Sequence, residues 1–486
     1  MGIIQRQGIK NAALSYVGIL LGFLSLLIIQ PHFLKPEEIG LTRVLFSFSF
    51  LISTLSTLGI GNITTRFFPH FKNQQERHSG FLGLVLIFPI VGTIITALFL
   101  SLFAHSIQHL YAEKSALFNE FYFWSIPYSF LIAITASVSV YCNALFKSTF
   151  PSLMNEVVNR LLFIALILTY AAGFCDLKTF ITLFVSIHLI QLVALFGYLL
   201  KVDVPSIKVS QAIFNRKTLA PMISYGLLLL FAGTASMGIK LLDTIVLGQF
   251  VSLDLVGVYA VVAFIPTFIE APLNALDKIA SPKIASALVN NDTKQILEIY
   301  TKSSRYLFAF GALMVLLLVF NIDALLTFLP ERFAVGRNVI LILSISALFN
   351  LITGSNNAIV FNSEKFYIGS AVLVLISLIT LALLYAFIPK WGLEGAAIAI
   401  GVSSILYNTF KYLFILIKFG IQPFDFKTAL ILMNFLITAA LSYFIHLAMH
   451  PLLSIVVHGL LITAIYGTLT VYTRVVSDLN WKKILG

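Results

Sequence analysis

The stretch FLKPEEIGLTRVLFSFSFLIS, residues 33–53, changes from a polar turn into an apolar and aromatic run. Such a run is typical of a helix that is embedded in a membrane. Arg43 nevertheless lies inside it, about one helical turn beyond Gly40. A permanent cation in hydrocarbon costs several kcal/mol unless another group receives it. The sequence therefore predicts that Arg43 has a partner or a function within the membrane.

The composition of the whole chain indicates the same class of protein. Of 486 residues, 59% are hydrophobic and only 10% are charged, and the mean hydropathy is +0.98. Soluble proteins are about half apolar and about one-quarter charged. No polar stretch is long enough to fold a core of its own, so we expect an integral membrane protein without a soluble domain. The net charge of +11 indicates cytoplasmic loops rich in Lys and Arg rather than a nucleic-acid partner.

The apolar runs predict an all-α, polytopic membrane protein with about 14 transmembrane helices. A helix needs about 20 apolar residues to cross a bilayer, and these runs do not alternate as the strands of a β-barrel would. The N-terminal run is too long for a signal peptide and is read as a retained first span. The expected spans are residues 11–33, 41–64, 80–104, 121–145, 152–173, 179–200, 219–248, 255–276, 306–329, 338–361, 367–388, 394–417, 428–448 and 451–473.

The distribution of Lys and Arg predicts the orientation. With the N-terminus inside, 22 of the 31 cationic residues fall in inside segments, 6 in outside segments and 3 within helices. Cytoplasmic loops carry the excess of Lys and Arg in membrane proteins. This bias supports an even number of spans, with both the N-terminus and the C-terminus in the cytoplasm.

The two halves of the chain resemble each other at nearly constant spacing. Repeats in the same orientation predict lobes related by an axis along the membrane normal, with the substrate between them. We therefore expect a six-helix lobe in residues 1–203, a second in 204–419, and helices 13 and 14 with a cytoplasmic tail in 420–486. The matched pairs are Ser15-Tyr16 with Ser224-Tyr225, residues 38–41 with 255–258, Asn143-Ala144 with Asn357-Ala358, and Tyr170-Ala171 with Tyr385-Ala386.

Several short motifs carry a family resemblance over about residues 1–420. They are PEEIGL (36–41), LGIG (58–61), RFFP (66–69), LDTIVLG (242–248), VGVYA (256–260), SPKIA (281–285) and GAAIA (395–399). The chain resembles the bacterial polysaccharide flippases, O-antigen flippase-like members of the multidrug/oligosaccharidyl-lipid/polysaccharide exporter superfamily. This resemblance implies a transporter that moves undecaprenyl-pyrophosphate-linked oligosaccharide across the bacterial cytoplasmic membrane by alternating access. It also implies a role in surface polysaccharide biosynthesis, such as that of lipopolysaccharide, beside glycosyltransferases and a glycan polymerase.

Cationic side chains within or beside the spans are candidates to bind the anionic headgroup. Arginine suits phosphate because its planar fork donates two hydrogen bonds and stays charged. Arg43 shares a helix face with Ser47 and Thr54, so it either lines a central cavity or lies near the outer interface and extends to the headgroups. The candidate cavity cations are Arg43, Arg160, Lys240, Arg66 and Lys147.

Three carboxylates within predicted spans have two interpretations each. Glu156 precedes Arg160 by four residues, and Lys240 precedes Asp243 by three. Each couple is either a self-contained ion pair or a cavity cation with a carboxylate that tunes it or carries a proton. Glu270 has no cation one turn away on its own helix, so it is a candidate for coupling-ion binding or a partner for another helix.

Neutral polar side chains form stripes on several predicted helices. Such stripes suit sugar hydroxyl groups, and they suit packing between helices equally well. The candidate polar lining residues are Ser47, Thr54, Asn155, Asn159, Asn350, Asn357 and Asn408.

Enzymatic activity is not expected, because the sequence has no phosphate-binding loop of the GxxxxGK[ST] type and no cluster with metal-ligand spacing. No cofactor is predicted, although coupling to H⁺ or Na⁺ stays open. The alternative function is a cation-coupled multidrug exporter of the same superfamily. Such an exporter is expected to carry a membrane carboxylate in its N-terminal half, and the first helix has none between Gly2 and Leu34. This absence favours an anionic substrate.

Overall fold

The computed structural model describes residues 3–73, 75, 77–203, 206–445 and 449–475, and these residues form helices without a single strand. The predicted all-α class is confirmed, as expected for a chain whose backbone groups find no partners in lipid. The chain divides into two compact units, residues 1–257 and 258–486. The lobe boundaries at 203 and 419 come from the sequence repeat and stay a prediction.

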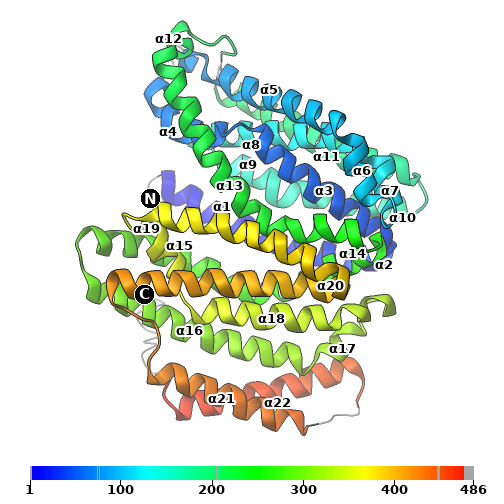
Figure 1. The fold of residues 1–486 in the computed structure, drawn as a ribbon, viewed down its shortest axis with the longest axis vertical. Coiled ribbons are helices and arrows are strands. Elements are labelled where there is room, and N and C mark those ends of the chain that lie inside the picture. Colours follow the sequence, from blue (N-terminus) through cyan, green and yellow to red (C-terminus); the bar gives the residue numbers. More distant parts are fainter. Residues whose placement is uncertain (1–2, 74, 76, 204–205, 446–448, 476–486) are drawn as a thin grey trace. The chain divides into compact units, whose positions relative to one another are not determined.

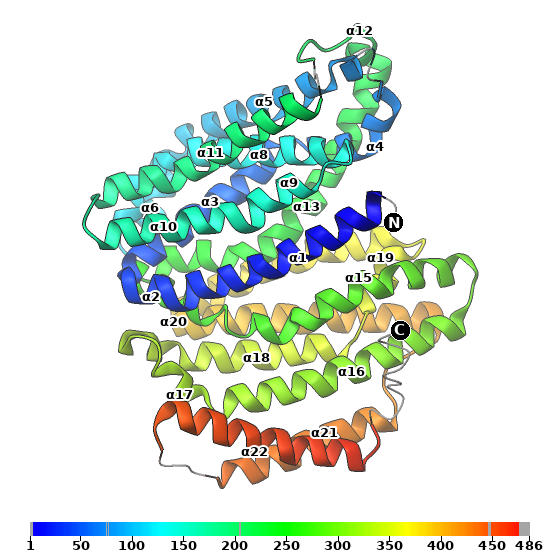
Figure 2. The same cartoon turned by 180° about the vertical axis from the view of Figure 1, so that it is seen from behind.

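The first unit is built around α3, which packs against α5, α8 and α13 (Figures 1 and 2). The core of this unit is formed by buried side chains of α4, α5, α8 and α11. Its elements are α1 (Ile3–Phe23), η1 (Leu24–Ile29), α2 (Gln30–Phe33), α3 (Pro36–Ser56), α4 (Ile60–Phe71), η2 (Arg77–Gly80), α5 (Phe81–Leu102), α6 (Ala104–Tyr111), α7 (Ala116–Phe121), η3 (Tyr122–Trp124), α8 (Ser125–Ala144), α9 (Thr149–Leu153), η4 (Met154–Val158), α10 (Asn159–Ala171), α11 (Leu177–Val202), α12 (Gln211–Phe214), α13 (Arg216–Phe250) and the start of α14 (Leu253–Val262).

The second unit is built around α16 and α18, which pack against each other and against α15. The C-terminal helices α21 and α22 lie side by side and pack against α16 (Figures 1 and 2). The elements are α15 (Thr267–Val289), α16 (Thr293–Val319), α17 (Ile322–Leu326), η5 (Glu331–Gly336), α18 (Arg337–Ile352), α19 (Asn356–Asn362), α20 (Phe366–Phe419), α21 (Phe426–Tyr443) and α22 (Pro451–Tyr472).

The number of spans agrees with the prediction once two breaks are considered. Twelve helices among the described residues are long and apolar enough to cross a membrane, and the pair α14 and α15, bent by 51°, supplies a thirteenth span. The 54-residue α20 contains Gly392 with a φ of 54°, where the chain turns and one long element becomes two spans. Together these features account for about 14 spans.

One large boundary difference is at α16, which begins at Thr293 rather than at the predicted residue 306. The carboxylate of Asp292 accepts a hydrogen bond from the backbone N–H of Gln295 at 3.0 Å and so caps the helix. Ile296 and Tyr300 then bury an apolar face of the polar first turns. Hydropathy alone did not reveal this extension, because the other faces of these first turns carry charged side chains.

The predicted second span, residues 41–64, is interrupted between α3 and α4. Leu58 and Gly59 have φ values of 48° and 76° in the left-handed region. A Cβ at position 59 would lie 2.2 Å from the carbonyl oxygen of Gly226 on α13. The two backbone segments therefore approach too closely for any residue other than glycine at position 59. This break forms one wall of the pocket described in the next section.

Two repeat-equivalent glycines of the first unit contact each other. A Cβ at Gly40 would lie 2.0 Å from the carbonyl oxygen of Leu253, and a Cβ at Gly257 would lie 1.9 Å from that of Pro36. In the predicted repeat, position 36 corresponds to 253 and position 40 to 257, so positions predicted to be equivalent exchange partners. This exchange is expected where two copies of one motif pack about a local twofold axis.

We expect Gly40→Ala to lower the free energy of unfolding by about 1–3 kcal/mol, because the added methyl group meets backbone that cannot rotate away. The measurement is the thermal unfolding midpoint of the detergent-purified protein. Gly197→Ala on α11 is the matched control, since a Cβ there has no neighbour within 4 Å. The control should unfold at or above the wild-type temperature, and equal midpoints for both variants would contradict the close packing at Gly40.

Candidate functional site

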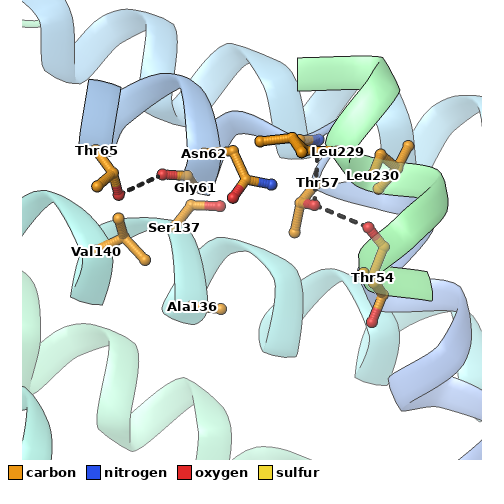
Figure 3. Close-up of a pocket in the computed structure, with 12 residues that line it drawn as sticks. Thr54, Thr57, Gly61, Asn62, Thr65, Ala136, Ser137, Val140, Leu229 and Leu230 are labelled. Carbon is orange, nitrogen blue, oxygen red and sulfur yellow. Dashed lines mark hydrogen bonds between the residues drawn. The ribbon is translucent and has the colours of Figure 1, made fainter. Parts of the chain in front are cut away.

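A pocket of about 280 Å³ lies in the first unit, at the break between α3 and α4 (Figure 3). Side chains and backbone of α3, α4, α8 and α13 form its wall, and none of the twelve lining residues is charged. The polar lining residues are Thr54, Thr57, Asn62, Thr65 and Ser137, and the remainder are Gly59, Gly61, Ala136, Val140, Leu229, Leu230 and Gly233.

The four hydroxyl groups of the pocket donate hydrogen bonds to backbone carbonyl oxygens of their own segments. Each hydroxyl oxygen keeps a lone pair that can accept a hydrogen bond from a ligand, including that of Thr57, which already accepts one from the backbone N–H of Gly59 at 3.4 Å. The exposed amide of Asn62 adds both a donor and an acceptor. The donated bonds are Thr54 to Phe50 (3.0 Å), Thr57 to Thr54 (2.8 Å), Thr65 to Gly61 (2.9 Å) and Ser137 to Ala133 (2.8 Å).

Arg43 is half-buried on α3 and has neutral partners. Its Nη2 donates to Oε1 of Gln30 at 3.4 Å, and the guanidinium lies close to the buried phenol of Tyr128 on α8. Within the described ranges it forms no ion pair with a carboxylate. The nearest acid along the helix, Glu38, instead accepts hydrogen bonds from the Tyr170 hydroxyl at 2.7 Å and from the Lys35 backbone at 2.8 Å.

These contacts favour the interior interpretation of Arg43 over extension to the lipid headgroups. An arginine that extends to the interface presents its guanidinium to water, whereas this one contacts an amide and a phenol of neighbouring helices. The part that Arg43 plays in binding a substrate stays a proposal.

Arg160 forms the ion pair that its spacing from Glu156 predicts as one alternative. Nη2 of Arg160 lies 3.3 Å from Oε2 of Glu156, and each side chain is about one-third exposed. Two glycines of α1 make room for the pair, since a Cβ at Gly18 would lie 2.7 Å from the Glu156 carboxylate and one at Gly22 would lie 2.9 Å from the Arg160 guanidinium. The first helix therefore packs directly on this pair.

Asn155 and Asn159 are linked through Gln191 on α11. Gln191 is buried, its amide nitrogen donates to Asn155, and its amide oxygen accepts from Nδ2 of Asn159 at 2.6 Å. This arrangement corresponds to the interhelical packing interpretation. Gln191 is not among the predicted site residues, although a glutamine in the middle of an apolar span is itself a signal that hydrogen-bond partners are near.

The other candidates of the first unit lie apart from the pocket. The guanidinium of Arg66 lies 4.4 Å from the ring centroid of Tyr225, a cation–π contact. Lys147 is exposed, and Ser47 is only 4% exposed and does not line the pocket. Of the predicted polar lining residues of this unit, the pocket contains Thr54.

The predicted pairing of Lys240 with Asp243 stays a prediction, because the side chain of Lys240 lies outside the described residues. Asp243 accepts a hydrogen bond from the backbone N–H of Thr244 at 2.6 Å. Within the described ranges, no group of three or more His, Cys, Asp and Glu side chains could hold a metal ion.

Three of the four candidates of the second unit, Glu270, Asn350 and Asn408, lie in one hydrogen-bonded group, which Thr353 joins by donating to the Asn350 carbonyl oxygen at 2.8 Å. Nδ2 of Asn350 donates to the carboxylate of Glu270 at 2.9 Å. Oδ1 of Asn408 accepts from Thr353 at 3.3 Å and from Asn356 at 3.2 Å. Asn357 is exposed, so the buried contact is made by its neighbour Asn356 and not by the predicted residue. The short helix α19 begins at Asn356 after a turn, and this turn shifts the helix face by one residue.

A family model described as "Polysaccharide biosynthesis protein" matches residues 6–277, more than half of the chain. The chain belongs to the polysaccharide biosynthesis protein family. The family resemblance predicted from the short motifs is thereby confirmed. A search of curated proteins finds no match for this family member.

Solved structures share the fold of this family member. Lipid II flippase MurJ in an inward closed conformation has a TM-score of 0.73 at 13% identity, over 96% of this chain and 98% of that one. An inward-facing multidrug resistance MATE family transporter of the MOP superfamily has a TM-score of 0.65 at 13% identity, over 85% and 98%. A MOP superfamily transporter from Pyrococcus furiosus has a TM-score of 0.54 at 13% identity, over 85% and 95%. Identities this low show a common fold alone.

Proposed function

We propose that the protein is a flippase that translocates undecaprenyl-pyrophosphate-linked oligosaccharide across the bacterial cytoplasmic membrane by alternating access. Membership of the polysaccharide biosynthesis protein family supports this function, and the fold shared with a lipid II flippase is compatible with it. The glycan would enter surface polysaccharide such as lipopolysaccharide O-antigen. Glycosyltransferases that build the lipid-linked glycan and a polymerase that consumes it are the partners to expect, and both termini would lie in the cytoplasm.

The observation that carries the proposal is Arg43, a cation in the first unit whose described contacts are neutral. A permanent charge in this setting favours an anionic ligand, and the pyrophosphate of the lipid carrier offers oxygens that match the guanidinium fork. The uncharged pocket at Thr54 and Thr57 lies farther along the same face of α3. Eleven residues of helix separate Arg43 from Thr54, which corresponds to about 16 Å along the helix axis.

The remaining charged candidates have subordinate roles in this proposal. Arg66 and Lys147, at predicted cytoplasmic ends, would attract the headgroup from the cytosol, since a positive field raises the local concentration of an anion. Arg160 and Lys240 would continue this field within the membrane, with Glu156 and Asp243 as their carboxylate partners. Glu270, which accepts a hydrogen bond from Asn350, would take part in coupling to an ion gradient.

A cation-coupled multidrug exporter is the second candidate, because a MATE family transporter shares the fold. The first unit disfavours this function, since Glu38 is engaged by Tyr170 and Glu156 by Arg160. A cationic drug would also be repelled by Arg43. We expect no resistance to cationic dyes on overexpression, and a clear efflux phenotype would favour the exporter instead.

The direct test is deletion of the gene in its bacterial host, followed by measurement of lipid-linked oligosaccharide in each leaflet of the cytoplasmic membrane. We expect the oligosaccharide to accumulate on the cytoplasmic leaflet and surface glycan to disappear, with both restored by the plasmid-borne gene. Unchanged distribution between the leaflets in a deletion strain would contradict the proposed function.

A further inference from the structure

Gln30, at the start of α2, is a buried amide whose two ends are both hydrogen-bonded. Its side chain is 1% exposed, and that of Ser25 is 5% exposed. Nε2 of Gln30 donates to the Ser25 hydroxyl at 3.1 Å, and Oε1 accepts from Nη2 of Arg43 at 3.4 Å. The short helix α2 packs against both α3 and α10 (Figure 2). The three side chains therefore link the end of the first span to α3.

The local backbone explains why the side chains of Ser25 and Gln30 meet. Residues five apart on an α-helix lie about 140° apart around its axis, so they do not face each other. Leu24–Ile29 instead form the wider π-helical turn η1, in which the backbone N–H of Gln30 donates to the carbonyl oxygen of Ser25. Pro31 follows directly and has no N–H with which to continue the regular ladder of an α-helix. The π-helical turn thus brings the two side chains to one face.

The orientation of the Gln30 amide follows from the chemistry of its neighbours. A guanidinium donates hydrogen bonds and cannot accept one. The amide oxygen must therefore face Arg43, which leaves the amide NH₂ group for the Ser25 hydroxyl. Because this second bond is buried, the amide cannot turn its oxygen away from Arg43 without losing it.

A glutamine at this place fixes the guanidinium of Arg43 without neutralising it. Cations within a membrane ordinarily pair with carboxylates or with backbone carbonyl groups. Glu38, the nearest acid along α3, is instead held by the Tyr170 hydroxyl and the Lys35 backbone. In the part of the chain that the structure describes, Gln30 is the hydrogen-bond partner of Arg43, so most of the guanidinium N–H donors are left for a ligand.

We propose that Gln30, held by Ser25, is a positioning residue that orients Arg43 toward the pyrophosphate of the substrate and preserves its charge. Gln30 acts through Arg43 and not by contact with the lipid. This inference rests on the proposed function, in which Arg43 binds the pyrophosphate. It adds that the preference for a pyrophosphate lipid over a neutral lipid depends on an uncharged residue of the first span.

The test compares the binding of two lipids to the full-length protein purified in detergent. The lipids are undecaprenyl pyrophosphate and undecaprenol, which has the same chain and no phosphate. We expect Gln30→Glu to weaken pyrophosphate binding by about tenfold or more, because the introduced carboxylate pairs with Arg43 and repels the anion. Undecaprenol binding should not change, since this lipid has no group for Arg43. The matched control is Gln295→Glu, the same substitution at an exposed position in the first turn of α16, which should leave both affinities unchanged.

A second variant, Gln30→Met, separates the hydrogen bond from the charge. Methionine has a similar length but only a weak acceptor, so Arg43 stays charged and loses its orientation. We expect pyrophosphate binding to weaken by about threefold or more, as for the loss of one hydrogen bond. Undecaprenol should again bind as it does to the wild type.

The two lipids distinguish failure of this inference from failure of the proposed function. Wild-type pyrophosphate affinity in Gln30→Glu would overturn the inference and leave the proposed function standing. Equal losses of both lipids in Gln30→Glu and Gln30→Met would also overturn it, because they indicate a residue that serves packing alone. A wild type that binds the two lipids equally would contradict the proposed function, and the inference with it.

Discussion

The Arg43→Gln variant should lose surface-glycan export by about 30-fold or more while inserting into the membrane at the wild-type level. Removal of one partner from a close charge pair costs about 2–5 kcal/mol, and each 1.4 kcal/mol corresponds to about tenfold. Glutamine keeps a hydrogen-bonding amide of similar length but has no charge for the pyrophosphate. The measurement is surface glycan in a deletion strain that carries the variant gene, normalised to the amount of protein in the membrane.

Two further variants separate charge from geometry. Arg43→Lys keeps the charge but not the planar fork, so we expect intermediate export. Arg337→Gln removes an arginine that is paired with the exposed carboxylate of Asp323 at 2.7 Å, and it should export normally. Full export by a triple variant with Arg43, Arg160 and Lys240 all changed to Gln, at normal protein levels, would refute a role for the membrane cations.

The Ala136→Phe variant should reduce export by about tenfold or more. Ala136 is an exposed residue of α8 that lines the pocket beside Ser137. A phenyl ring there occupies the space into which Thr57 and Asn62 face, and it removes no polar group and adds no charge. The loss of two or three hydrogen bonds to a sugar, each worth about 0.5–1.5 kcal/mol, accounts for this reduction. The measurement is again normalised surface glycan in the deletion strain.

The control for this variant is Ala171→Phe, which adds the same ring at an exposed position at the end of α10, away from the pocket. It should export as the wild type does. If Ala136→Phe also exports normally, the pocket is not a subsite for the glycan. Loss of export in both variants would instead indicate a general intolerance of added bulk.

The hydrogen-bond partners of the site illustrate what the sequence could not reveal. Gln191 bonds to Asn155 over 36 residues, and Asn350 bonds to Glu270 over 80 residues. Periodicity along one helix shows which side chains share a face, but it does not show which other helix that face meets. The pocket depends in the same way on Leu229 and Leu230 of α13, which the polar stripes of α3 and α8 do not indicate.

The sequence by itself determined the helical class, the approximate spans, the family and the presence of charges within the membrane. These are local properties, since each spanning segment must satisfy its own backbone and present its own apolar surface to lipid. Tertiary structure alone decided that Arg160 pairs with Glu156 and that Arg43 meets Gln30 and Tyr128. These choices depend on helix breaks and on approaches between distant segments, because burial of a charge is decided by every helix that surrounds it.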